Sequence, residues 1–184
     1  MFIQTEQTPN PATLKFLPGR TVLTTGTANF PDADAASRSP LAQKLFALDG
    51  VTGVFLGYDF ITVSKAPAMD WYALKPSVLG AIMDAFTTGV AVMQTDAVAT
   101  PDSTALAEDD EIVAQIKELI DTRVRPAVAQ DGGDIIFHGF EDGVVFLHMQ
   151  GSCAGCPSST ATLKSGIENM LRHYIPEVSE VRAV

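Results

Sequence analysis

Two cysteines three positions apart, Cys153 and Cys156, are the residues with the clearest chemical potential, and this 184-residue chain contains no other cysteine. They lie in the run GSCAGCPSSTATLK, from Gly151 to Lys164. Such a pair can close a disulfide, exchange electrons as a dithiol, or bind a metal centre through its thiolates. Because a tetrahedral zinc ion or a cubane iron-sulfur cluster commonly takes four protein ligands, the pair supplies half of either site.

The three histidines are the first candidates for the missing ligands. His138 and His148 lie on a predicted hairpin, and His173 lies near the end of the last predicted helix. His148 is the best placed of them because it precedes Cys153 by five residues, although this spacing is more typical of one face of a strand. A second copy of the chain also completes the count, since a two-fold axis would place four cysteines around one shared centre.

Groups near the pair are expected to favour a thiolate, whereas the charge of the surrounding domain opposes one. Pro157 is a typical first residue of a helix, so Cys156 would lie at the positive end of a helix dipole. Acidic side chains outnumber basic ones from Asp109 to Val184, so the stabilisation must be local. The expected donors are the backbone of a small-residue loop and nearby hydroxyl groups, from Gly151, Ser152, Ala154, Gly155, Ser158 and Ser159.

The second half of the chain predicts the order helix, strand, strand, helix, strand. The first helix is expected from Asp110 to Gln130, with apolar residues at helical spacing: Ile112, Ile116, Leu119, Ile120, Val124 and Val128. The run Asp131-Gly132-Gly133 ends it, and we interpret the glycine pair as a left-handed helix cap in preference to a backbone that closely approaches a ligand.

A hairpin is expected to deliver the chain to the cysteine pair. Strands over residues 134–140 and 144–150 flank Glu141-Asp142-Gly143, which has Asp-Gly turn chemistry. The pair therefore falls between this hairpin and a helix that begins at Pro157 and ends before Pro176. The apolar stripe of that helix is Leu163, Ile167, Leu171 and Tyr174. A short strand over residues 177–184 completes the unit.

The first half of the chain also mixes strands and helices. Strands are expected over residues 2–8 and 13–18, with a third over 22–26, and residues 51–65 form a hairpin with a turn near Tyr58 and Asp59. Helices are expected from Leu41 to Leu48 and after Asp70, where Pro76 opens the main helix. This half contains no cysteine or histidine and offers no soft metal ligand.

The fold class expected from these patterns is α+β with two small domains. Residues 93–108 are poor in large apolar side chains and are interpreted as a linker between domains 1–92 and 109–184. A hydrophobic content of 46% is enough to bury a core in each domain.

Several function classes are disfavoured. A net charge of -10 leaves no basic field for a nucleic acid, and no apolar run is long enough to span a bilayer. No Walker-type glycine loop or Ser-His-Asp set is present, so we do not expect an enzyme. The amino terminus resembles neither a signal nor a transit peptide, which favours a reducing cytoplasm, with an organellar matrix as the alternative if a transit peptide has been removed.

The sequence resembles the NifU-like, or Nfu, iron-sulfur scaffold and carrier proteins. The resemblance rests on RPAVAQDGGDIIFHGFEDGVVFLHMQGSCAGCPSSTATLKSGIENML in the second half, and on QTEQTPNPATLKFLPG and DWYALKPSVLGAIMDAF in the first. It implies an Nfu-type amino-terminal domain and a NifU-like cluster-binding domain. It also implies that Cys153 and Cys156 bind a [4Fe-4S] cluster shared by the two subunits of a homodimer. The cluster assembly machinery would then be the donor, and apo-enzymes the recipients.

Two other functions stay open on the residues alone. A dithiol oxidoreductase also places a CxxC pair before a helix, but the expected βαβ context is missing and proline follows the second cysteine instead of separating the two. A structural dimer joined by zinc would use the same four thiolates as a shared cluster.

Overall fold

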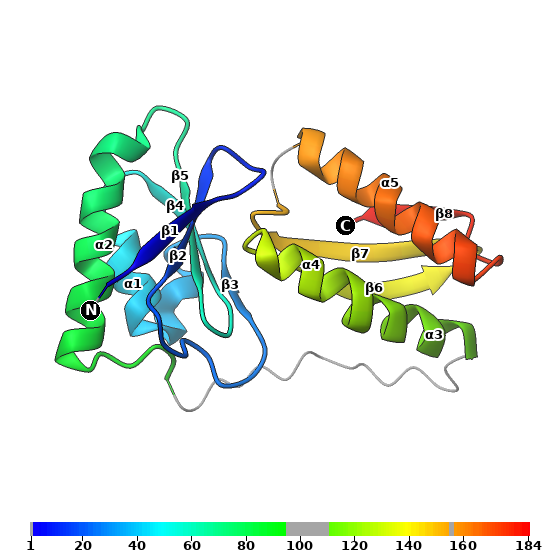
Figure 1. Ribbon diagram of the computed structural model, residues 1–184, viewed down its shortest axis with the longest axis horizontal. Helices are drawn as coiled ribbons and strands as arrows, with labels where there is room; N and C mark the ends of the chain where they lie inside the picture. Colours follow the sequence, from blue (N-terminus) through cyan, green and yellow to red (C-terminus); the bar gives the residue numbers. More distant parts are fainter. Residues whose placement is uncertain (1, 95–110, 155–156) are drawn as a thin grey trace. The chain divides into compact units, whose positions relative to one another are not determined.

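The computed structural model describes three parts of the chain, residues 2–94, 111–154 and 157–184, without the side chains of residues 157–159. The chain divides into two compact units, Met1–Ala99 and Thr100–Val184, drawn from blue to green and from green to red in Figure 1. Both units combine helices with a β-sheet, which confirms the predicted two-domain α+β class. The predicted linker lies almost entirely outside the described residues, so its boundaries stay a prediction.

The amino-terminal unit is a five-stranded antiparallel sheet with helices packed against it. Its strands follow the order β1-β2-β5-β4-β3, and a continuous apolar core joins α1 and α2 to the sheet. The elements are β1 (Gln4–Gln7), β2 (Thr13–Leu17), β3 (Ala28–Phe30), a 3-10 helix (Ala35–Arg38), α1 (Pro40–Phe46), β4 (Val51–Leu56), β5 (Ile61–Lys65) and α2 (Trp71–Thr88).

Two predictions for this unit are wrong. Residues 22–26 do not form a strand, because the N–H groups of Val22 and Leu23 both donate to the single carbonyl of Tyr58, at 2.7 and 3.2 Å, and do not extend a ladder. Pro76 does not open a helix but lies inside α2. The helix begins earlier because the Asp70 side chain accepts a hydrogen bond from the N–H of Tyr72, at 2.9 Å.

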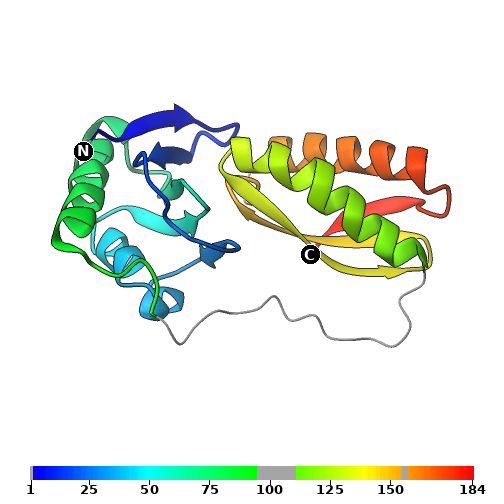
Figure 2. The ribbon, with the colours of Figure 1, turned by 60° about the horizontal axis from the view of Figure 1, so that its bottom comes forward.

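The carboxy-terminal unit has the predicted order helix, strand, strand, helix, strand. Its sheet has the order β6-β7-β8, with β6 antiparallel and β8 parallel to β7. Figure 2 shows its helices over one face of the sheet, where one apolar core forms. The elements are α3 (Glu111–Leu119), a π-helical turn (Ile120–Val124), α4 (Arg125–Gln130), β6 (Gly133–Glu141), β7 (Val144–Gly151), α5 (Pro157–Tyr174) and β8 (Glu180–Ala183).

The first helix of this unit contains a π-helical turn that the sequence pattern did not predict. Its buried residues, Ile116, Ile120, Val124 and Val128, recur at a strict spacing of four. In an α-helix of 3.6 residues per turn such a stripe drifts around the axis. The wider π turn, closed by a hydrogen bond from the N–H of Arg125 to the carbonyl of Ile120, brings the stripe back towards the sheet.

The hairpin and the last helix follow the prediction with one exception. Asp142 and Gly143 both have positive φ, 49° and 78°, as a two-residue type I′ turn requires. Ile167 and Leu171 are buried in the core, but Tyr174 is 47% exposed. Ile175 is buried in its place, because the chain leaves the helix after Tyr174 and turns back towards β8. No helix among the described residues is long and apolar enough to cross a membrane.

Candidate metal-binding site at the cysteine loop

The structure places Cys153 two residues beyond the end of β7, in the loop that leads to α5. Its side chain is buried, at 6% exposure, and packs into the core of the carboxy-terminal unit. Cys156 lies outside the described residues, as do the side chains of Ser158 and Ser159. The CxxC pair as a complete site therefore stays a prediction, and the geometry available is that of its first cysteine.

Hydrogen bonds fix the loop on both sides of Cys153. The Ser152 N–H donates to the Gly132 carbonyl at 3.2 Å, and the buried Ser152 hydroxyl donates to the carbonyl of Asp131. From the first turns of α5, the Thr160 hydroxyl donates to the Cys153 carbonyl at 3.2 Å. The loop is thus attached to the end of the first helix and to the start of the last one.

The two glycines that precede β6 have different roles. Gly132 has a φ of +80°, so it supplies the left-handed backbone that ends the helix, as predicted. Gly133 instead lies against the cysteine loop, where a Cβ atom would be 2.5 Å from the Cys153 Sγ and 2.8 Å from the Gln150 carbonyl oxygen. Gly133 therefore closely approaches the protein's own cysteine loop, a packing role that the sequence analysis did not consider, and the approach to a ligand that it disfavoured stays untested.

Burial makes Cys153 a poor thiolate in the apo-protein. The pKa of its thiol is raised to about 11, first because burial disfavours the charged form. A hydrogen bond from Ser152 lowers it, and the negative charges of Asp131 and Asp134 raise it further. The expected opposition from acidic side chains is therefore present at short range, and a metal ion must displace a proton from Cys153 to bind it.

The histidines are not brought to this site. His148 is exposed, between the buried Leu147 and Met149 of β7, and so lies on the opposite face of the strand. Its Nδ1 is 3.0 Å from the Val184 carbonyl oxygen. His138 and His173 are also exposed. Because its side chain lies on the face of β7 away from the core that contains Cys153, the structure does not support His148 as a third ligand. Among the described residues, which do not include Cys156, no group of three or more His, Cys, Asp or Glu side chains could hold a metal ion.

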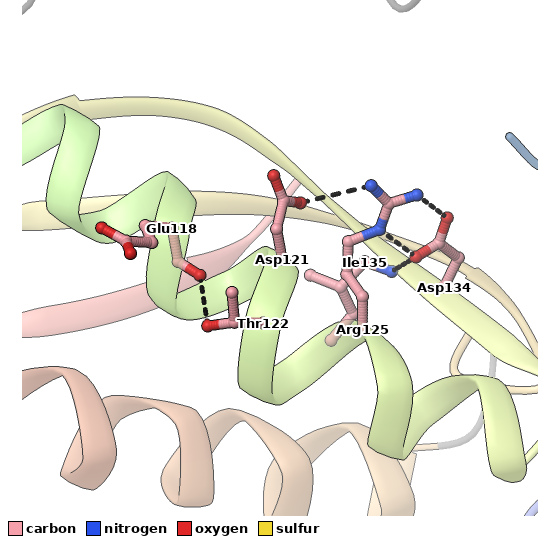
Figure 3. A network of polar contacts seen from close by, with 6 residues as sticks. All are labelled: Glu118, Asp121, Thr122, Arg125, Asp134 and Ile135. Atoms are coloured by element: carbon pink, nitrogen blue, oxygen red, sulfur yellow. Dashed lines mark hydrogen bonds and ion pairs between the residues drawn. The ribbon is translucent and has the colours of Figure 1, made fainter.

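The sequence analysis missed an ion pair beside this loop. Arg125 donates from Nε and Nη2 to the two carboxylate oxygens of Asp134, at 2.9 and 2.8 Å, and from Nη1 to Asp121 at 3.2 Å (Figure 3). The Asp134 side chain is only 4% exposed. The pKa of Arg125 is raised above its ordinary value, first by the hydrogen bond to Asp134. An aspartate at the start of a buried strand was the available signal, because a buried carboxylate requires a partner.

The carboxy-terminal unit is a small α+β domain in which a buried cysteine lies in the loop between a β-hairpin and a helix. Residues 3–89 match the family model described as "Scaffold protein Nfu/NifU N terminal", and residues 116–182 match the "NifU-like domain". The chain therefore belongs to the Nfu/NifU scaffold protein family.

Curated relatives match along the whole chain. "NFU1 iron-sulfur cluster scaffold homolog, mitochondrial" from Homo sapiens is 56% identical over 186 residues, covering 100% of this chain and 72% of the human protein. The protein of the same name from Drosophila sechellia is 56% identical over 185 residues, and this chain spans 65% of it. Among solved structures, a NifU-like protein from Saccharomyces cerevisiae aligns with a TM-score of 0.47 and 25% identity, covering 52% of this chain and 86% of its own.

Proposed function

We propose that this protein is an iron-sulfur cluster scaffold that binds a [4Fe-4S] cluster between two subunits and transfers it to apo-proteins. Cys153 and Cys156 of each subunit are the proposed ligands. The observation that carries the proposal is the loop at Cys153, where the contact with Gly133 and the hydrogen bonds of Ser152 hold the first thiol of a CxxC pair in place. The side chains of all three histidines are exposed. The names of the relatives support the scaffold role.

A cluster held in this way is suited to transfer. Each subunit would contribute only two thiolates, so a recipient could replace them one at a time. In each exchange one bond from iron to a recipient thiolate forms and one bond from iron to a scaffold thiolate breaks, with no change in oxidation state. The displaced cysteine then takes up a proton, and the cluster is not oxidised or reduced by the exchange.

The partners and location follow from the same proposal. The partners are a second copy of this chain, the cluster assembly machinery as donor, and apo iron-sulfur enzymes as recipients. We propose no enzymatic activity, in agreement with relatives that are named as scaffolds. Those relatives are also named mitochondrial, which favours the organellar matrix, the alternative to the cytoplasm that the sequence analysis placed first.

The iron, sulfide and zinc content of anaerobically reconstituted protein, together with its visible absorbance, distinguishes this function from the two alternatives, a structural zinc dimer and a dithiol oxidoreductase. We expect the visible absorbance of a [4Fe-4S] cluster, with iron and sulfide bound in equal amounts and no zinc. Bound zinc without sulfide would indicate a structural zinc dimer. A colourless protein whose two thiols cycle reversibly with a disulfide would indicate a dithiol oxidoreductase.

A fragment of residues 109–184 is expected to bind the cluster as well as the full chain does. Both cysteines lie in this fragment, and the carboxy-terminal unit has an apolar core of its own. Far-ultraviolet circular dichroism would establish that the fragment is folded, and iron and sulfide analysis would measure binding. The same fragment with Cys153→Ser is the control for adventitious iron. If the folded fragment failed to bind while the full chain succeeded, the amino-terminal domain would be part of the site.

A further inference from the structure

Arg125 and Asp134 form an ion pair with fixed geometry at the start of β6. Both carboxylate oxygens of Asp134 accept hydrogen bonds from the Arg125 guanidinium, and Oδ1 also accepts one from the N–H of Ile135, at 2.8 Å. Such a bidentate contact constrains distance and orientation together, which a lysine at the same position could not do. The pair therefore fixes where the backbone at Asp134 lies relative to α4.

The backbone held by Asp134 is the segment that contacts Cys153. Gly133 directly precedes Asp134, and its Cα lies so close to the cysteine loop that an added Cβ would meet the Cys153 Sγ at 2.5 Å. The carbonyls of Asp131 and Gly132 accept the two hydrogen bonds from Ser152. A shift of residues 131–133 would therefore displace the loop of Cys153.

On its other side, the pair is held by the helix that carries Arg125. Arg125 follows the π-helical turn, and its N–H closes that turn on the Ile120 carbonyl. Asp121 accepts a further hydrogen bond from Nη1 of the same guanidinium, at 3.2 Å. Figure 3 shows the guanidinium between the two carboxylates, with Asp121 on the helix and Asp134 on the strand.

We infer that Arg125 and Asp134 act as a positioning pair for the cluster site, fixing residues 131–133 and, through them, the position of the loop that carries Cys153. This role rests on the proposed scaffold function, and neither side chain touches the metal. Loss of the pair should leave the domain folded while the loop opens more often. Cys153 would then be more accessible in the apo-protein, and the cluster would leave the holo-protein faster.

Alkylation of the apo-protein tests the positioning role without any cluster. In a Cys156→Ser background, the rate at which iodoacetamide modifies Cys153 reports local opening of the loop. We expect Arg125→Gln and Asp134→Asn each to raise this rate about tenfold at fixed pH. A purely electrostatic effect would have opposite signs in the two variants, because removing Arg125 disfavours the thiolate while removing Asp134 favours it. An increase in the alkylation rate in both variants therefore indicates that the loop of Cys153 is no longer held in position.

Two control variants distinguish the loss of loop positioning at Cys153 from a general loss of domain stability. Val181→Ala truncates a fully buried side chain of the same core. Val181 lies in β8 and pairs with Val145 near the start of β7, whereas the cysteine loop follows the other end of that strand, so the change lowers stability without releasing the loop. Arg182→Gln removes an exposed arginine that donates a hydrogen bond to the partly exposed Glu180, at 3.1 Å. Both should alkylate at the rate of the parent protein. An increase with Val181→Ala as large as that with Asp134→Asn would overturn the inference.

The holo-protein gives the second readout. We expect Arg125→Gln and Asp134→Asn to shorten the half-life of the cluster in excess chelator about tenfold. Arg125→Lys, which keeps the positive charge but cannot make the bidentate contact with Asp134, should give an intermediate half-life. If either main variant failed to fold, Asp121→Asn, which removes only the outer support of Arg125, should shift both readouts by a smaller amount in the same direction.

The combined results of alkylation and cluster binding show which proposal fails, the scaffold function or the positioning role of Arg125 and Asp134. If the parent protein bound no cluster while the two variants alkylated faster, the scaffold function would fail and the positioning of Cys153 would stand. If the parent bound the cluster and both variants matched it in alkylation rate and half-life, the positioning role would be wrong.

Discussion

Cys153→Ser and Cys156→Ser are each expected to abolish cluster binding. In a symmetric dimer either substitution removes half of the four thiolates at once, because it occurs in both subunits. A serine hydroxyl has nearly the same shape as the thiol but is a far poorer ligand for iron, so the fold should be retained. Iron and sulfide content and visible absorbance after anaerobic reconstitution measure the effect.

The matched control for these substitutions is His148→Ala. His148 was the best candidate for a third ligand, but it is exposed on the face of β7 opposite the buried residues. The variant should therefore bind the cluster as the parent protein does. A cysteine variant that retained a full cluster, or a His148→Ala variant that lost it, would contradict the proposed ligand set.

Gly133→Ala is expected to disrupt the site without touching a cysteine. The new methyl group would be 2.5 Å from the Cys153 Sγ, 2.8 Å from the Gln150 carbonyl oxygen and 3.1 Å from the Cys153 nitrogen. A different Cys153 rotamer could relieve the first contact, but the other two involve backbone atoms and require the loop to move. We expect a loss of about 1–3 kcal/mol in the free energy of unfolding, together with loss of most of the bound cluster.

Gly139→Ala is the control, since it makes the same change in the same strand. Gly139 lies in β6, and a Cβ there would meet no atom within 4 Å. Denaturant unfolding and reconstitution of the two variants can be compared directly. The account expects Gly139→Ala to match the parent protein in both measurements, and a Gly133→Ala protein with unchanged stability and cluster content would refute the close packing inferred at Gly133.

Local signals were sufficient to predict the order of elements around the cysteine pair. The Asp142-Gly143 turn, the proline at the start of α5 and the repeating apolar residues each specify structure within a few neighbouring residues. The prediction that Pro76 opens the helix was wrong, although proline is common at the first position of a helix. The residue that caps the start of α2 is Asp70, six residues earlier. A capping interaction of this kind competes directly with a proline signal.

The features that the sequence did not predict depend on contacts between distant segments. The hydrogen bonds from Arg125 to Asp134 require α4 and the start of β6 to meet. The approach of Gly133 to Cys153 joins the first residue of β6 to the loop that follows β7, at the open end of the hairpin. The π-helical turn also follows from packing, because the sheet selects which residues of the stripe must face it. Residue spacing along the chain does not contain this information.

Sedimentation of the apo- and holo-protein tests the central claim, that one cluster is shared between two subunits, most directly. At micromolar concentration the apo-protein should sediment mainly as a monomer, and the reconstituted protein as a dimer that carries all of the visible absorbance. Addition of an apo-enzyme that requires a [4Fe-4S] cluster should activate the enzyme as the dimer disappears. Visible absorbance that sediments with a monomer, or a dimer that keeps its cluster while excess apo-enzyme stays inactive, would contradict the account.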